Sequence, residues 1–168
     1  MELLYNNTIV KTVSGLDYRA ILAEGADHIF SGRTPNSLYR AKDLGLPILF
    51  RNYKLSDDIG YRFSARWWVE YPLTAEKWAR WASGVREDCI NIFMDYETFG
   101  EHQWEDTGIF AFLQKLPEEV LNKNLNFSTP LEIVEKYSPV AEIDIGDFST
   151  ISWADLERDT SAWLGNDM

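Results

Sequence analysis

The sequence predicts an α/β protein in which a mainly parallel sheet is covered by helices. Short apolar runs rich in β-branched and aromatic residues alternate with segments that have helical spacing and capping residues. Most of these runs also end in a cluster of polar residues, as strands do when their carboxyl ends form a functional edge. The predicted strands are Tyr18 to Ala23, Leu46 to Phe50, Cys89 to Met94, and Val140 to Ile145.

The helices are expected before, between and after these strands. Asn6 and Asn7 precede a first helix, Thr8 to Ser14, which has apolar residues on one face. Ser56 has the character of a helix N-cap, so Asp57 and Asp58 would serve the helix dipole. One further helix is predicted to begin at Thr74. The others are predicted at Thr107 to Leu113, Pro117 to Asn122, and Leu131 to Tyr137.

Composition limits the kinds of function that the chain can have. With 168 residues, 45% of them apolar, the chain fits one folded domain and is not a disordered segment. Seven Trp and eight Tyr predict either a ring-rich core or a surface on which flat ligands stack. A net charge of −11 argues against nucleic acid and anionic membranes as partners, whereas a neutral ligand such as a sugar is compatible with it.

The amino terminus has no basic segment followed by a long apolar one, and no apolar run reaches the length of a membrane span, so a soluble cytoplasmic protein is expected. Cys89 lies in an apolar run and is expected to be a buried, inert thiol. His28 and His102 are far apart and lack ligand spacing, so the sequence predicts no metal site and no cofactor.

The strongest functional signal is the stretch from Asn91 to Trp104. An apolar run here changes abruptly into a cluster of polar and aromatic side chains, with Gly100 allowing the chain to turn away. Acids at the carboxyl end of a buried strand are costly for folding and are typical of active sites. The alternative is a helix amino terminus that collects acids for its dipole. The polar and aromatic residues are Asp95, Tyr96, Glu97, Phe99, Glu101, His102, Gln103 and Trp104.

Three separated blocks resemble the α-amylase branch of glycoside hydrolase family 57. They read ILFRNYKLSDDIGYRFS, MDYETFGEHQW and ISWADLERDTSAWLGN, and the similarity covers nearly the whole chain. The resemblance implies a retaining enzyme that acts on α-glucans or maltooligosaccharides. It also implies an incomplete (β/α)7 barrel of parallel strands with the helices outside.

The resemblance assigns two catalytic carboxylates. Asp95, the first acid of the DxExFG block, corresponds to the general acid/base. Glu2, followed by Leu3-Leu4-Tyr5-Asn6, corresponds to the nucleophile, although the Asn-Thr that precedes it in the family is replaced by Met1 alone. A retaining mechanism requires the two carboxyl groups to lie roughly 5–5.5 Å apart. Burial among rings and the nearby charge of Glu2 would keep Asp95 protonated.

The remaining candidate residues are expected to contact substrate. Glu97 and His102 could orient Asp95 or bind a sugar hydroxyl. Trp104, Trp153 and Asp155 resemble subsite residues, with the rings stacking on pyranose faces and the acid accepting from hydroxyls. For Trp153 and Trp163, core packing is an equally good interpretation.

Compared with the family, residues 1–168 correspond to a fragment of a single catalytic barrel domain that lacks its amino-terminal strands. We therefore expect an exposed sheet edge, little hydrolase activity from the chain by itself, and a separate amino-terminal half as a partner. Two alternatives remain open at this point. One is a 4-α-glucanotransferase of the same family, and the other is a non-catalytic glucan-binding subunit.

Overall fold

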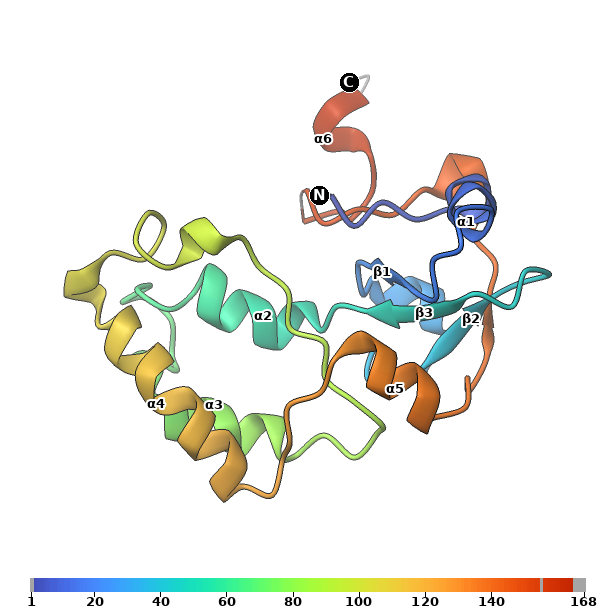
Figure 1. The fold of residues 1–168 in the computed structure, drawn as a ribbon. Coiled ribbons are helices and arrows are strands. Elements are labelled where there is room, and N and C mark those ends of the chain that lie inside the picture. Colours follow the sequence, from blue (N-terminus) through green and yellow to red (C-terminus); the bar gives the residue numbers. More distant parts are fainter. Residues whose placement is uncertain (1, 155, 165–168) are drawn as a thin grey trace. The chain divides into compact units, whose positions relative to one another are not determined.

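The computed structural model describes residues 2–154 and 156–164, which fall into two compact units (Figure 1). The first, here called the sheet unit, comprises Met1–Arg51, Glu87–Asn91 and Ser128–Met168. The second, the helical unit, comprises Asn52–Arg86 and Ile92–Phe127. The chain passes between the units after Arg51, Arg86, Asn91 and Phe127, and each unit is described by itself.

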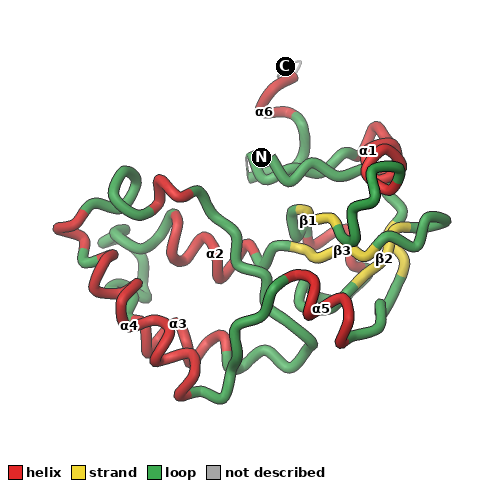
Figure 2. The backbone as a smooth tube through the Cα atoms, viewed as in Figure 1, coloured by secondary structure: helices red, strands yellow, loops and turns green. Residues whose placement is uncertain are grey.

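The sheet unit contains a four-stranded sheet in the order β1-β3-β2-β4 (Figure 2). β1 pairs in parallel with β3, and β2 pairs in parallel with β4, whereas β2 and β3 are antiparallel. The predicted α/β class is confirmed, while the partial barrel stays a prediction. The strands are β1 (Ile21–Ala23), β2 (Tyr39–Ala41), β3 (Pro47–Phe50) and β4 (Glu142–Ile143).

The predicted strand from Cys89 to Met94 is wrong. Only Asn91 pairs, through an isolated parallel bridge to Arg51, and its side-chain amide donates to the carbonyl of Phe50 at 3.0 Å. The chain crosses from the sheet unit to the helical unit directly after Asn91, so no further residue of this run can continue the pairing. The apolar side chains of the run are only half-buried.

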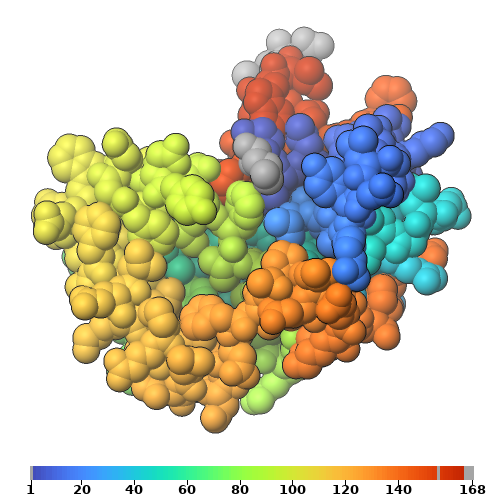
Figure 3. All heavy atoms as spheres, viewed as in Figure 1, coloured from blue at the N-terminus to red at the C-terminus, as the bar shows by residue number. Residues whose placement is uncertain are grey.

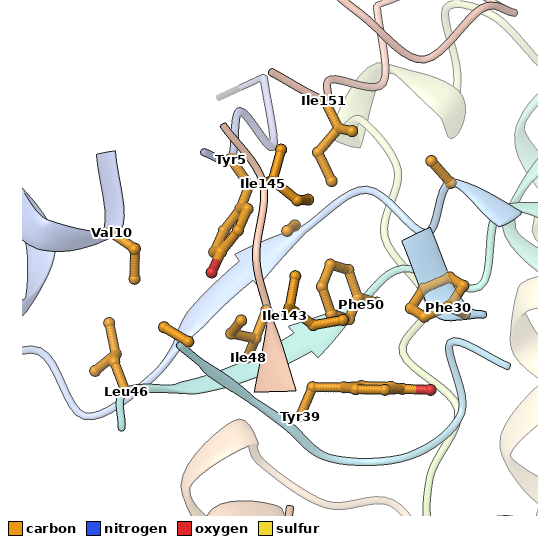
Figure 4. Close-up of a cluster of buried hydrophobic side chains, with 13 residues drawn as sticks. Tyr5, Val10, Phe30, Tyr39, Leu46, Ile48, Phe50, Ile143, Ile145 and Ile151 are labelled. Atoms are coloured by element: carbon orange, nitrogen blue, oxygen red, sulfur yellow. The ribbon is translucent and has the colours of Figure 1, made fainter. Parts of the chain in front are cut away.

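The core of the sheet unit is rich in aromatic rings (Figure 4). Phe50 is fully buried and packs edge-on against Phe30 and Tyr39, with ring centroids 5.0 and 5.4 Å apart. Ile48 points to the same face of β3, whereas Leu49 points to the other face and packs with Leu38 and Ile133. This alternation buries both faces of β3, which explains its continuous apolar sequence.

Helices and short turns surround this sheet. The Asn6 side chain caps α1 (Asn7–Ser14) by accepting from the amide of Ile9, and α5 (Pro130–Lys136) begins with a capping box. The sheet unit also contains the 3₁₀ turns Asp27–Phe30 and Asp147–Ser149 and the short α6 (Ser161–Leu164).

The helical unit contains α2 (Tyr53–Gly60), α3 (Ala75–Ala82) and α4 (Ile109–Asn122), with α3 packed against α4. Its 3₁₀ turns are Tyr96–Thr98 and Glu105–Thr107. Phe110 and Leu121 of α4 are exposed apolar residues. Figure 3 shows the segment that contains α4, coloured gold, at the surface. Among the described residues, none of the helices has both the length and the apolar character needed to cross a membrane.

Two predictions for this unit are wrong. Asn52, not Ser56, caps α2, and Ser56 is instead fully buried and accepts from the amide of Phe93 at 3.2 Å. Pro117 lies inside α4 rather than opening a separate helix. The proline leaves the carbonyl of Leu113 without its helical donor, and both residues are exposed, so water can satisfy that carbonyl.

Candidate active site

The side chain of Glu2 lies next to Trp153, far away in the sequence. Tyr5 and Ile151 form an antiparallel bridge in which each backbone amide donates to the other residue's carbonyl at 3.1 Å. Beyond this isolated bridge, Glu2 lies beside Ser152 and Trp153. The indole nitrogen of Trp153 donates to Oε2 of Glu2 at 3.1 Å, and the hydroxyl of Ser152 donates to the Glu2 backbone carbonyl at 3.2 Å. Glu2 is thus exposed but anchored.

A buried ion pair lies beside this contact. Glu24 directly follows β1 and Arg51 directly follows β3, so the parallel pairing of the two strands brings both side chains to one edge of the sheet. Nη1 of Arg51 lies 3.2 Å from Oε2 of Glu24, and the two side chains are only 8% and 0% exposed. Nε of Arg158 lies 3.4 Å from the other Glu24 oxygen.

Arg51 links this pair to Trp153. Its guanidinium carbon lies 5.3 Å from the centroid of the indole ring, which is a cation–π geometry. Gly25 permits the close approach of the strand ends, because a Cβ at this position would lie 2.0 Å from the Arg51 carbonyl oxygen. Sequence reasoning missed Glu24 and Arg51, although each is the first polar residue after a predicted strand.

Asp95 begins a tightly folded loop of the helical unit. Its backbone carbonyl accepts from the amide of Thr98 at 3.1 Å, and the carbonyl of Glu97 accepts from the amide of His102 at 2.9 Å. Thr98 and Gln103 are buried, at 2% and 3% exposure, and the Gln103 amide donates to the Gly60 carbonyl at 3.1 Å. The buried residues of the loop fix its backbone.

The acids and rings of the same loop face the solvent. Asp95, Glu97 and His102 are exposed, and Trp104 is 66% exposed while its indole nitrogen donates to the carbonyl of Glu101. Most of the predicted cluster therefore exists as exposed side chains on one loop, except Gln103, which is buried, and Phe99, which is half-buried. The loop is not the helix amino terminus of the alternative interpretation, because only a 3₁₀ turn of three residues, Tyr96–Thr98, follows Asp95.

The structure brings together Glu2 with Trp153 in the sheet unit, and Asp95 with Glu97, His102 and Trp104 in one loop of the helical unit. Asp155 lies outside the described residues. Trp163 is 49% exposed and so is not a core residue. The catalytic roles and the separation of the two carboxyl groups stay predictions.

Metal ligands are not clustered in the described part of the chain. No group of three or more His, Cys, Asp or Glu side chains there is arranged to hold a metal ion. His28 lies on the exposed side of the Asp27–Phe30 turn.

Comparison with known proteins identifies the family. The model of glycosyl hydrolase family 57 matches residues 1–146. A protein of Methanocaldococcus jannaschii named "Putative alpha-amylase" is 54% identical over 168 residues, which is 99% of this chain and 36% of that relative. This chain thus spans about a third of the relative's length. No solved structure matches the chain. Since the family model covers most of the sequence, the chain belongs to glycosyl hydrolase family 57.

Proposed function

We propose that the chain contributes both catalytic carboxylates of a retaining glycoside hydrolase that acts on α-glucans. Glu2 is the nucleophile and Asp95 is the general acid/base. Family membership supports the class of reaction, and the name of the Methanocaldococcus jannaschii relative supports α-glucans as substrates.

The observation that carries the proposal is the anchored carboxylate of Glu2. A nucleophile must be ionised, reachable by substrate and held in one orientation. Glu2 is exposed, and its carboxylate accepts from the Trp153 indole while its backbone accepts from Ser152. The indole donor therefore holds the carboxylate in one orientation while the side chain stays open to substrate.

Asp95 meets the requirements of the second carboxylate in a different way. The loop that holds it is fixed by buried Thr98 and Gln103, so its backbone position is defined. The described residues leave Asp95 exposed, and we propose that bound glucan and the rest of the catalytic domain cover it.

The proposed reaction follows from these roles. Asp95 donates its proton to the glycosidic oxygen while Glu2 attacks the anomeric carbon, which releases one end of the glucan and leaves a covalent glycosyl ester on Glu2. Asp95, now ionised, takes a proton from water. The resulting attack on the anomeric carbon breaks the ester and restores both carboxyl groups with net retention.

The neighbouring exposed residues supply substrate contacts. Trp104 presents an open ring on which a pyranose can stack, and Glu97 and His102 can bond sugar hydroxyls. Asp155 is assigned the same role from the sequence resemblance alone.

We further propose that this chain acts together with the part of the domain to which the remainder of the relative corresponds. The chain covers 36% of that protein, and a cleft long enough for a glucan needs walls that a partial domain lacks. By itself the chain should have little hydrolase activity. In complex with the remaining part, contributed by a separate polypeptide or a longer chain, it should be active.

The test is release of reducing ends from amylose and maltooligosaccharides. We would assay the chain alone and after reconstitution with the part of the Methanocaldococcus jannaschii relative that it does not cover. Activity that appears on reconstitution and disappears in Glu2→Gln and Asp95→Asn supports the proposal. Ladders of longer oligosaccharides from maltotriose would show a 4-α-glucanotransferase instead. Glycogen binding by the reconstituted complex without turnover would show a non-catalytic glucan-binding subunit.

A further inference from the structure

We propose that Trp153 is a positioning residue for Glu2, and that the buried pair of Glu24 and Arg51 holds its indole ring in place. The inference deepens the proposed function and rests on Glu2 as the nucleophile. It differs from the sequence expectation, in which Trp153 stacks on a sugar, because its N–H group is directed at a carboxylate of the protein itself.

The first step is the contact between the two residues. The Trp153 indole nitrogen lies 3.1 Å from Oε2 of Glu2, and its backbone nitrogen lies 3.4 Å from the carbonyl oxygen of Glu2. The same residue therefore holds both the backbone and the side chain of Glu2. A hydrogen bond to an ionised group is about twice as strong as one between neutral groups.

The second step concerns what holds the indole. Arg51 lies over the ring at 5.3 Å from its centroid, and Arg51 is itself fixed by Glu24, which is fully buried. Buried charges are costly and are retained only when they are paired. This pair lies at the sheet edge where β1 and β3 end, so its position is defined by the register of the two strands.

The third step is electrostatic. A cation over the face of an indole draws electron density from the ring, which makes the N–H group a better donor. The charges then alternate along the contacts, from the Glu24 carboxylate through the Arg51 guanidinium and the indole N–H to the Glu2 carboxylate. This order favours one orientation of the Glu2 carboxylate, as a nucleophile requires.

Nuclear magnetic resonance of the chain labelled with ¹⁵N-tryptophan tests the contact without any need for activity. The chain has seven Trp, and the indole signal that disappears in Trp153→Phe is that of Trp153. We expect this signal to move with one carboxyl titration in the unaltered chain and to lose that titration in Glu2→Gln. The matched control is Glu157→Gln, which removes an exposed acid from the same segment and should leave the titration intact.

The ring contact is tested by Arg51→Lys, which keeps the positive charge beside Glu24 but loses the planar guanidinium. We expect faster solvent exchange of the Trp153 indole proton, closer to that of Trp67, which is 73% exposed. The proposal would be overturned if the Trp153 indole signal titrated identically in the unaltered chain and in Glu2→Gln. It would also be overturned if the exchange rate of the indole proton were unchanged in Arg51→Lys.

The functional effect is measured in the reconstituted enzyme with Trp153→Phe, which keeps a ring and loses only the N–H group. We expect kcat to fall about 10-fold or more with little change in KM. A raised KM with unchanged kcat would show a substrate contact instead. Full activity of Glu2→Gln would reject Glu2 as the nucleophile, and with it the proposed function. The contact between Trp153 and Glu2 would still be tested independently by the indole titration.

Discussion

The buried pair of Glu24 and Arg51 gives the sharpest prediction about stability. In Glu24→Gln the carboxylate is replaced by a neutral amide of nearly the same shape, and Arg51, only 8% exposed, loses its opposite charge. Removing one charge of a buried pair typically costs about 3–5 kcal/mol. That is a large fraction of the free energy of unfolding of a typical domain, which is about 5–15 kcal/mol.

The sheet itself provides a matched control. Glu142 on β4 pairs with Arg40 on β2 at 2.7 Å, but the two side chains are 47% and 51% exposed. The same substitution, Glu142→Gln, should cost about 0.2–1 kcal/mol because water screens an exposed pair. Both changes replace a Glu that faces an Arg of a neighbouring strand, and they differ in burial and in the second contact that Glu24 makes with Arg158.

The assay is urea unfolding followed by circular dichroism for the two variants and the unaltered chain. With an m value of about 1–3 kcal/mol/M, Glu24→Gln should lower the midpoint by roughly 1 M or more, and Glu142→Gln by much less. Equal midpoints for the two variants would contradict this prediction, because they would show that the buried pair of Glu24 stabilises the fold no more than the exposed pair of Glu142 does.

Three further predictions concern other positions. Gly25→Ala should destabilise the sheet unit by about 1–3 kcal/mol in the same assay, because its Cβ would lie 2.0 Å from the Arg51 carbonyl oxygen. Gly146→Ala is the control and should have little effect, because no atom lies within 4 Å of the added Cβ. Similar losses of stability in both variants would contradict this prediction. Gln103→Leu removes the donor to the Gly60 carbonyl and should lower the free energy of unfolding by about 1–3 kcal/mol. The control Gln114→Leu changes an exposed residue and should have little effect. Equal losses in the two variants would show that the Gln103 amide does not fix the loop. Burial raises the pKa of the Cys89 thiol to about 11, so the rate of its alkylation by iodoacetamide should still increase with pH above 9. A rate that no longer increases above pH 9 would contradict this prediction.

Local sequence patterns predicted part of the fold and the loop of acids. The apolar runs before Glu24 and Arg51 do form strands, and the helix predicted from Leu131 to Tyr137 exists as α5. The acids and rings after Asn91 do lie together, because they share one short loop whose anchors, Thr98 and Gln103, are a few residues away. Such features depend on interactions between near neighbours.

The features that sequence reasoning missed depend on long-range contacts. The Trp153 indole contacts a residue 151 positions away, which requires the pairing of Tyr5 with Ile151. Burial of Glu24 is likewise not visible in the sequence, because the same acid after a strand is usually exposed. The run at Cys89 has the composition of a strand, but the chain leaves the sheet unit after a single bridge.

In the proposed reaction Glu2 forms the covalent intermediate, while Asp95 donates and accepts the proton. The most direct measurement is mass spectrometry of the reconstituted enzyme after treatment with a fluorinated glucosyl fluoride, which slows breakdown of a glycosyl ester. We expect a single glycosyl group on the peptide that contains Glu2. The group should be absent in Glu2→Gln and should still form in Asp95→Asn, because fluoride departs without an acid. A label on any other carboxylate, or turnover by Glu2→Gln, would contradict it.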